Sequence, residues 1–129
     1  MVGIVIVSHS RKVAEGIREL ALQMAAPAQL IIAAGGTADG LIGTDAFKIK
    51  EAIAAADSGD GVLVMVDLGS AVLSAERAIK MLEGEPRQVK IADAPIVEGT
   101  IAAAVEASVG QPLGNVAATA EGARELRKQ

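Results

Sequence analysis

The sequence has no cysteine, tryptophan or tyrosine, and Phe47 is its only aromatic residue. Without cysteine there is no disulfide framework and no thiolate chemistry, which fits a reducing compartment. Without aromatic side chains the chain has no platform on which bases or a flavin could stack. Its core must be built from Ala, Val, Ile and Leu, which favours helices packed closely on a sheet.

Positive charge is also scarce. The 129 residues include 12 Lys and Arg against 16 Asp and Glu, a net charge of −4, which argues against nucleic-acid binding. No apolar run approaches the ~20 residues of a membrane span, and the first residues lead straight into an apolar run that leaves no room for a signal peptide. We therefore expect one soluble, cytoplasmic domain over residues 1–129, without membrane insertion.

The chain consists of short apolar runs that alternate with amphipathic segments. The apolar runs predict strands at 2–7, 30–33, 62–66 and 89–92. The segments between them predict helices at about 11–25, 45–57, 71–82, 95–108 and, with a poorer apolar stripe, 112–126. Ser10 and Thr44 are suitable N-caps for the first two helices. The residues predicted to face inward are Val13, Ile17, Leu20, Ala21 and Met24, then Ala46, Ile49, Ile53 and Ala56, then Val72, Ala75, Ile79 and Leu82, and finally Val97, Ile101, Ala104 and Val105.

The order of these elements predicts an α/β fold in which an open parallel sheet has helices on both faces. The first and third strands are the most continuously apolar and belong in the centre, which gives the strand order 2-1-3-4. In that order, a crevice opens between the carboxyl ends of the two central strands. His9, the only histidine, follows one of these strands and Asp67 follows the other, so the topology brings the two side chains together.

A histidine beside a carboxylate is suited to covalent catalysis. One ring nitrogen can attack while the other donates to the carboxylate, which fixes the tautomer. If the transferred group is phosphoryl, helix N-termini, hydroxyls and glycines around the pair would supply hydrogen-bond donors. The candidate phosphate-binding or partner-binding residues are Ser8, Ser10, Gly36, Thr37, Thr44, Gly69 and Ser70.

Simpler interpretations remain open for several of these residues. Asp67, Thr44 and Ser70 have side chains that are common helix caps, and Gly36 belongs to a Gly-Gly pair that is also typical of a turn without a ligand. The sequence has neither a P-loop nor a GxGxxG motif, so tight nucleotide binding is not expected.

Five segments taken together resemble the phosphotransferase subunit of dihydroxyacetone kinase, a family that is itself similar to the mannose-family IIA domain of the sugar phosphotransferase system. No single motif is decisive, but the ordered set is specific and covers nearly the whole chain. The segments are Val5–Ser10, Gly35–Gly36, Ile42–Asp45, Val64–Ala71 and Ala94–Gly99.

The resemblance implies a homodimer with the 2-1-3-4 sheet, phosphorylated on His9 and with Asp67 orienting the ring. The phosphoryl group would come from phosphoenolpyruvate through enzyme I and the histidine phosphocarrier protein. It would pass to ADP in the nucleotide-binding subunit of the kinase, supporting dihydroxyacetone phosphorylation in glycerol metabolism. The chain would be a phosphotransferase component with no cofactor or metal of its own, because ADP, ATP and magnesium would be held by the partner subunit.

Three other functions remain open. A mannose-type IIA domain would pass the phosphoryl group to a sugar-transport IIB domain. A tetrapyrrole metal chelatase can begin with a similar strand and His-Ser segment, although it normally presents further metal ligands. A ligand-sensing or scaffold dimer, in which His9 only forms hydrogen bonds, would form no covalent adduct. The sequence also leaves open which ring nitrogen reacts and whether the Ala-rich helices or the edge strand at 89–92 form the dimer.

Overall fold

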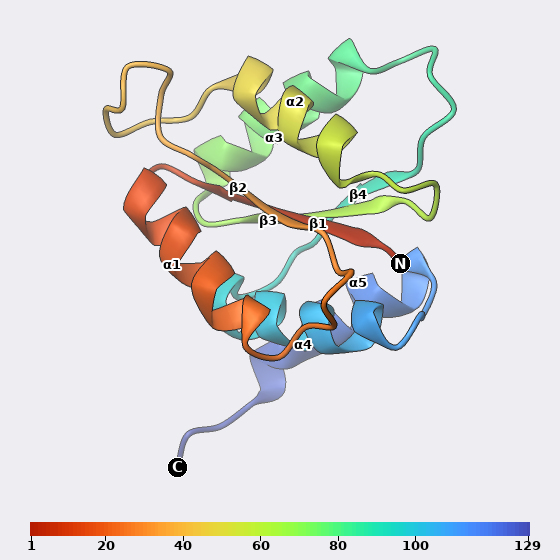
Figure 1. Ribbon diagram of the computed structural model, residues 1–129. Coiled ribbons are helices and arrows are strands. Elements are labelled where there is room, and N and C mark those ends of the chain that lie inside the picture. The colour runs from red at the N-terminus through yellow and green to blue at the C-terminus, as the bar shows by residue number, and fades with distance from the viewer.

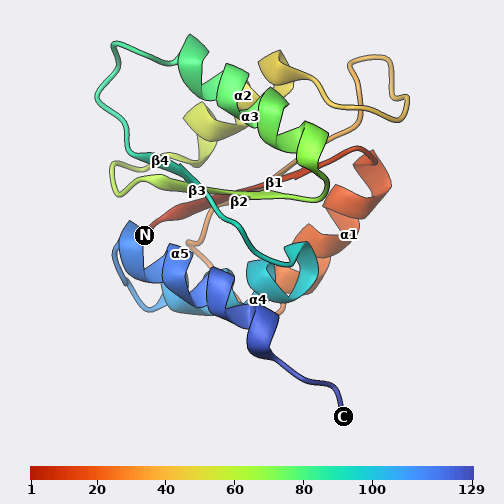
Figure 2. The same ribbon diagram turned by 180° about the vertical axis from the view of Figure 1, so that it is seen from behind.

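The computed structural model describes residues 1–129 and contains a four-stranded parallel sheet between two layers of helices (Figures 1 and 2). The sheet order is β2-β1-β3-β4, which confirms the predicted α/β fold and strand order. The strands are β1 (Gly3–Ser8), β2 (Ile31–Gly35), β3 (Val62–Val66) and β4 (Val89–Ile91). The helices are α1 (Arg11–Leu22), α2 (Ala46–Ala56), α3 (Gly69–Met81), α4 (Ile96–Ser108) and α5 (Leu113–Gly122), followed by the 3-10 turn η1 (Ala123–Glu125).

The two layers explain why the central strands are continuously apolar. Helices α2 and α3 cover one face of the sheet, and α1, α4 and α5 cover the other (Figures 1 and 2). Successive residues of a strand point to opposite faces, so Ile4 and Ile6 pack with α1, α4 and α5. Val5 and Val7 pack with α2 and α3. A strand buried on both faces favours apolar side chains along its length, and β1 stays apolar up to Val7, ends at Ser8 and is followed by the histidine.

The helices turn small residues, rather than the predicted larger ones, towards the sheet. In α1 the buried residues are Ala14, Ile17 and Ala21. Val13 and Leu20 were predicted to face inward but are 46% and 53% exposed, so that prediction was wrong. Alanine has the smaller side chain, which lets the helix backbone approach the sheet more closely, while the larger residues flank the contact. Met24, also predicted inward, lies beyond the end of α1 and is exposed.

The same shift occurs in α3 and α4. Val97 and Val105 were predicted to face inward and are exposed instead. Val72 and Ile79 are only partly buried at the edge of the core. The buried positions are Ala71, Ala75 and Ala78 in α3, and Gly99, Thr100, Ala103, Ala104 and Ala107 in α4. In α2, Ile49, Ile53 and Ala56 are buried as predicted.

Helix α2 is capped one residue later than predicted. Asp45 Oδ1 accepts hydrogen bonds from the backbone N–H groups of Phe47 and Lys48, at 2.9 and 3.4 Å. The prediction that Thr44 caps this helix was therefore wrong. Thr44 Oγ1 lies 2.5 Å from Ser74 Oγ and so links the start of α2 to α3.

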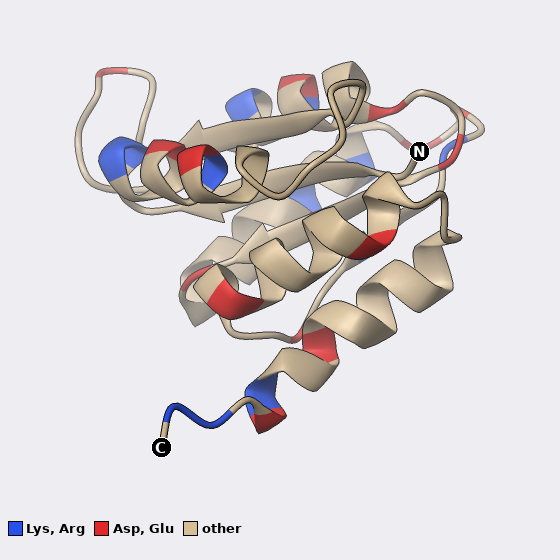
Figure 3. Ribbon diagram, turned by 60° about the horizontal axis from the view of Figure 1, so that its bottom comes forward, with Lys and Arg blue, Asp and Glu red and all other residues tan.

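Helices α4 and α5 carry no positive charge. The sequence has no Lys or Arg between Lys90 and Arg124, and these two helices show red segments but no blue in Figure 3. These two helices therefore offer no basic patch to a nucleic acid. No helix in the molecule has the length and apolar character that crossing a membrane requires.

Candidate functional site

The carboxyl ends of β1 and β3 bring His9 and Asp67 together, as the strand order predicted. The register pairs Val7 with Val66, so the residues that follow the two strands emerge at the same edge of the sheet. His9 Nδ1 lies 3.0 Å from Asp67 Oδ1. Both side chains are partly buried, with His9 22% and Asp67 17% exposed. The sequence could predict this pair because it depends on topology and not on side-chain detail.

The Asp67 carboxylate has hydrogen-bond partners on both oxygens. Oδ2 accepts from the Ser8 hydroxyl at 2.9 Å and from the His9 backbone N–H at 3.0 Å. Oδ1 accepts from the Leu68 backbone N–H at 2.7 Å, in addition to facing His9 Nδ1. Burial alone raises the pKa of Asp67, but the hydrogen bonds from His9, Ser8 and Leu68 outweigh burial and lower this pKa below its ordinary value. Asp67 is thus held as a carboxylate.

The charge on Asp67 determines the tautomer of His9. An ionised carboxylate can only accept hydrogen bonds, so the ring hydrogen of a neutral His9 lies on Nδ1. Nε2 then carries the lone pair. It lies 2.6 Å from Ser70 Oγ, in the first turn of α3, and this hydroxyl donates to it. The geometry therefore leaves Nε2 as the nucleophilic nitrogen.

Ser8 and Ser10 support the turn that contains His9. Ser8 is fully buried; besides donating to Asp67, its hydroxyl accepts a hydrogen bond from the Ser10 backbone N–H at 3.1 Å. Ser10 Oγ accepts from the Val13 backbone N–H at 3.3 Å, which confirms Ser10 as the N-cap of α1. The structure thus places the Ser8 hydroxyl behind the pair, against Asp67, and not at the surface.

Gly36 and Thr37 shape the loop between β2 and α2. Gly36 has a φ of 75°, which favours glycine, and its N–H donates to the last carbonyl of β1 at 3.1 Å. Thr37 forms two hydrogen bonds of 3.0 Å with the backbone of Leu41, one through its N–H and one through its hydroxyl. The Gly43 N–H donates to the His9 carbonyl at 2.8 Å, which holds the loop against the histidine.

Gly69 and Ser70 form the start of α3, beside His9. The N-cap of this helix is Leu68, which forms no side-chain capping bond. Backbone N–H groups at an uncapped helix start remain available to an anion. The simpler interpretation of Asp67 and Ser70 as helix caps therefore does not describe their contacts. Thr44, by contrast, is occupied by Ser74.

Two residues outside the predicted set contact the pair through backbone atoms. Leu68 donates its N–H to Asp67, and Gly43 donates its N–H to His9. No side-chain pattern could have identified them, because every residue except proline has such a donor.

His9 lies outside the main hollows of the surface. None of the five main hollows of the surface, of about 290 to 550 Å³, is lined by His9. A hollow of about 500 Å³ between the ends of β3 and β4 is lined by Asp67 and Leu68 but not by the histidine. No group of three or more acidic or histidine side chains is placed to hold a metal ion.

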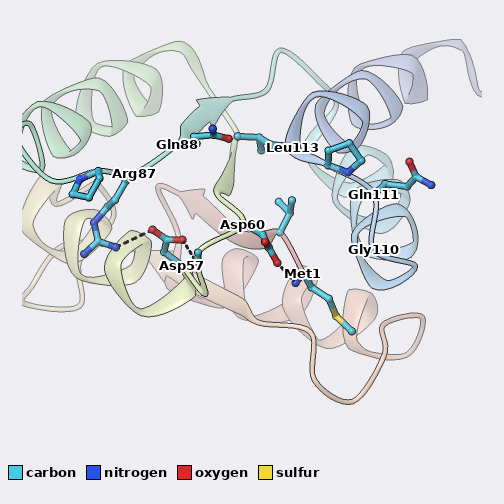
Figure 4. A pocket seen from close by; sticks show the side chains of 12 residues that line it. Met1, Asp57, Asp60, Arg87, Gln88, Gly110, Gln111 and Leu113 are labelled. Carbon is cyan, nitrogen blue, oxygen red and sulfur yellow. Dashed lines mark hydrogen bonds and ion pairs between the residues drawn. The ribbon is translucent and has the colours of Figure 1, made fainter.

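A separate hollow of about 510 Å³ lies at the amino ends of the strands, the opposite edge from His9 (Figure 4). Its charged side chains are paired with neighbours. Arg87 points at Asp57, with a nitrogen–oxygen distance of 3.0 Å, and Asp60 points at the amino group of Met1. We assign no role in the chemistry of His9 to this hollow.

The fold is that of a IIA component of the phosphotransferase system. The family model described as the phosphotransferase-system fructose IIA component matches residues 3–117. A crystal structure of the system's component EIIA from Streptococcus agalactiae has the same fold, with a TM-score of 0.69 at 15% identity over 95% of this chain and 92% of that chain. A crystal structure of a protein of unknown function is more similar, with a TM-score of 0.84 at 42% identity over 95% of both chains.

Curated relatives narrow the family further. The phosphoryl donor subunit DhaM of PEP-dependent dihydroxyacetone kinase 2 from Listeria innocua is 43% identical over 110 residues, 84% of this chain and 88% of that protein. The DhaM subunit of Escherichia coli K12 is 45% identical over 133 residues, all of this chain but only 28% of that longer protein. The chain belongs to this family of IIA-type phosphoryl donor subunits, as the resemblance of its five segments predicted.

Proposed function

We propose that this chain is a phosphohistidine carrier. It accepts a phosphoryl group from the histidine phosphocarrier protein and passes it to ADP bound in the nucleotide-binding subunit of a dihydroxyacetone kinase. The observation that carries the proposal is the His9 ring, which has Nδ1 held by Asp67 and the lone pair on Nε2. The names of the Listeria and Escherichia relatives, phosphoryl donor subunits, support the direction of transfer.

The proposed reaction consists of two in-line substitutions at phosphorus. His9 Nε2 forms a bond to phosphorus while the bond between phosphorus and the donor's histidine nitrogen breaks, and the leaving imidazole keeps the electron pair. A terminal oxygen of ADP then attacks the same phosphorus, the N–P bond breaks, and the electron pair returns to Nε2. Asp67 balances the positive charge on the ring during both steps, and the hydrogen stays on Nδ1 throughout.

Donors beside Nε2 fit a phosphoryl group. In the unphosphorylated state the Ser70 hydroxyl donates to Nε2. Once Nε2 is bonded to phosphorus it no longer has a lone pair, and the hydroxyl is free to donate to a phosphoryl oxygen instead. The backbone N–H groups at the start of α3 lie on the same side. Preorganised donors of this kind stabilise the charge that develops during transfer.

The remaining parts of the proposal concern the cofactor, the location and the assembly of the chain. The chain holds no cofactor, and the nucleotide and magnesium belong to the kinase subunit. It acts in the cytoplasm with its partners. It forms a homodimer, and β4, which has three residues and is paired only with β3, leaves an open sheet edge for such contacts.

A second acceptor, a sugar-transport IIB domain, is favoured by one observation: the matching family model describes a sugar-specific IIA component. Both candidates share the first half-reaction and differ only in the second. One experiment therefore tests the carrier function and separates the two acceptors.

The test is phosphorylation followed by discharge. The protein is incubated with phosphoenolpyruvate, enzyme I and the histidine phosphocarrier protein, and its intact mass is measured at neutral to alkaline pH. We expect one acid-labile phosphoryl group in wild type and none in His9→Ala. Addition of the ADP-loaded kinase subunit should remove it, whereas a IIB domain should not. If wild type gains no mass from a donor system shown to be active, the carrier function is wrong.

A further inference from the structure

One hydrogen bond joins two of the segments that contact His9. The loop between β2 and α2 contacts the histidine backbone, because the Gly43 N–H donates to the His9 carbonyl at 2.8 Å. Helix α3 contacts the ring through Ser70, whose hydroxyl lies 2.6 Å from Nε2. The residue after Gly43 is Thr44, and its Oγ1 lies 2.5 Å from Ser74 Oγ in α3. We call the two side chains Thr44 and Ser74 the hydroxyl clamp.

The hydroxyl clamp closes a ring of contacts around the histidine. The loop forms one half of the ring, from His9 through Gly43 to the clamp. Helix α3 forms the other half, from the clamp through Ser70 to Nε2. Ser74 follows Ser70 by four residues in α3, so the two side chains lie on the same face, one turn apart. A displacement at the clamp is therefore passed to the Ser70 hydroxyl through a single helical turn.

No other hydrogen bond holds α3 to this loop. Residues 36–56, which form the loop and α2, share only the clamp with α3. The helix start is held weakly in other respects, since its N-cap makes no side-chain bond and Gly69 has open space around it. The buried Ala71 and Ala75 set the distance between α3 and the sheet. The clamp is thus the one directional contact between α3 and the loop that holds His9.

We propose that Thr44 and Ser74 are positioning residues for phosphoryl transfer, which keep the Ser70 hydroxyl in reach of Nε2 and of a phosphoryl group bonded to it. This inference rests on the proposed function. In that function Ser70 donates first to Nε2 and then to a phosphoryl oxygen, and a hydrogen bond weakens steeply when its distance and angle change. The ring of His9 has no hydrogen bond with either clamp hydroxyl, so both act through Ser70.

The test removes the clamp from each side in turn. Thr44→Val replaces the hydroxyl with a methyl group at constant shape. Ser74→Ala removes the other hydroxyl within a helix, where alanine has the higher propensity, so a slower variant cannot be attributed to a weakened helix. Thr44→Ser keeps the hydroxyl and is the conservative variant. Thr119→Val is the matched control, because Thr119 is also partly buried and its hydroxyl joins α5 to α4 by donating to Glu106 at 2.8 Å.

The rate of His9 phosphorylation is measured with two donors, the phosphorylated histidine phosphocarrier protein at saturation and the small molecule phosphoramidate. We expect Thr44→Val and Ser74→Ala each to lower this rate by about three- to tenfold with both donors, the value of one neutral hydrogen bond. The double variant should be no slower than either single one, because both substitutions break the same bond. The half-saturating concentration of the carrier protein should not change. Thr44→Ser should restore most of the rate, and Thr119→Val should react as wild type.

Two further measurements test whether the clamp acts through Ser70. Ser70→Ala removes the hydroxyl that the clamp positions, so adding Thr44→Val to it should slow phosphorylation no further. The nitrogen chemical shift of His9 Nε2 reports on the same hydroxyl without any phosphoryl donor. In Thr44→Val this shift should move toward its value in Ser70→Ala, and in Thr119→Val it should stay at the wild-type value.

Several results would overturn the inference. One is a wild-type rate in both Thr44→Val and Ser74→Ala. Another is a loss of rate that adds to the loss in Ser70→Ala, since the clamp would then act by a different route. An equal loss in Thr119→Val would show a general loosening of the fold, and a change confined to the half-saturating concentration of the carrier protein would show a role in docking.

The two donors also separate this inference from the function on which it rests. If the carrier protein does not phosphorylate wild type while phosphoramidate does, the proposed function is wrong. The phosphoramidate rates and the Nε2 chemical shift still decide in that case whether Thr44 and Ser74 position the Ser70 hydroxyl.

Discussion

Replacing Asp67 with Asn tests the central pair without changing its shape. The carboxylate faces four donors, two at each oxygen: the Ser8 hydroxyl and His9 N–H at Oδ2, and the Leu68 N–H and His9 Nδ1 at Oδ1. A carboxamide has one oxygen and one NH₂ group, so it can satisfy only one of these two positions. Each orientation of the amide has a different consequence.

With the amide oxygen at the Oδ1 position, the tautomer survives but the NH₂ group meets the backbone N–H of His9. With the NH₂ group at the Oδ1 position, it donates to Nδ1, which forces the ring hydrogen onto Nε2 and removes the attacking lone pair. It also meets the Leu68 N–H. In both orientations one backbone donor loses its acceptor, and the charge that balances a phosphorylated ring is gone.

We expect Asp67→Asn to slow phosphorylation of His9 by about 10³- to 10⁴-fold, the size of effect when a histidine is held in the wrong tautomer. The unpaired N–H should lower the free energy of unfolding by about 1 kcal/mol, the lower end of the range for an unsatisfied donor, because the site is partly exposed. Rapid-quench measurement of single-turnover phosphorylation gives the rate, nitrogen NMR of the His9 ring gives the tautomer, and urea unfolding gives the stability. A variant that reacts within about threefold of wild type, far inside the tautomer effect, and keeps its hydrogen on Nδ1 would refute this reasoning.

Four further predictions concern single positions. Ser8→Ala removes a donor to Asp67 and the acceptor of the Ser10 N–H. We expect the free energy of unfolding, measured in urea, to fall by about 1 kcal/mol, and the pKa of Asp67, measured by carbon NMR, to rise. An unchanged pKa would show that Ser8 does not help to hold Asp67 ionised. Folding lowers the pKa of Asp67, so its ionised form stabilises the protein at pH values above the ordinary pKa of 3.8, and this contribution is lost as the pH falls through the lower, folded pKa. The difference in unfolding free energy between wild type and Asp67→Asn should therefore shrink in acid. A difference that grows in acid would contradict the lowered pKa. Gly3→Ala would press a methyl group onto the Ala56 carbonyl oxygen and should destabilise by about 1–3 kcal/mol. Gly16→Ala, in α1 with open space around the new methyl group, should instead stabilise by about 0.5–1 kcal/mol, and the two melting temperatures should move in opposite directions.

The parts of the fold that the sequence could predict are those fixed by burial on two faces. β3 and, up to Val7, β1 are fully buried and therefore continuously apolar, which identifies them as the central strands. The strand order then places His9 and Asp67 together without any knowledge of their rotamers. The pair was predictable because it depends only on where two strands end.

The inward faces of the helices were not predictable in the same way. In α1 and α4 larger apolar residues lie beside the buried stripe, and periodicity cannot tell a stripe of alanines from a neighbouring stripe of valine and leucine. The larger stripe is the more hydrophobic one, yet the close approach of helix to sheet selects the smaller side chains, such as Ala14 and Ala104. The cap of α2 had the same ambiguity, since Thr44 and Asp45 are adjacent and both side chains suit the position.

Details of the site that depend on rotamers and backbone atoms also lay beyond the sequence. Ser8 and Ser10 flank the histidine symmetrically in the sequence, but Ser8 is fully buried and donates to Asp67, whereas Ser10 accepts from the start of α1. Ser8 is the last residue of β1, whereas Ser10 is the N-cap of α1, so the two serines belong to different elements. The backbone donor of Leu68 has no signature at all.

The saturated carboxylate has a consequence for what the histidine is able to do. Asp67 already has hydrogen-bond partners at both oxygens and its pKa is lowered, so it is a poor proton acceptor and does not take the hydrogen from Nδ1. In the proposed reaction, the ring gains a phosphoryl group at Nε2 and gives it back without any proton leaving the pair, which keeps the two half-reactions reversible. Since 22% of the His9 side chain is exposed, the chain alone leaves part of the ring open to water. In the proposed reaction a docked protein partner covers this part of the ring, and fast transfer should be confined to the time that a partner is docked.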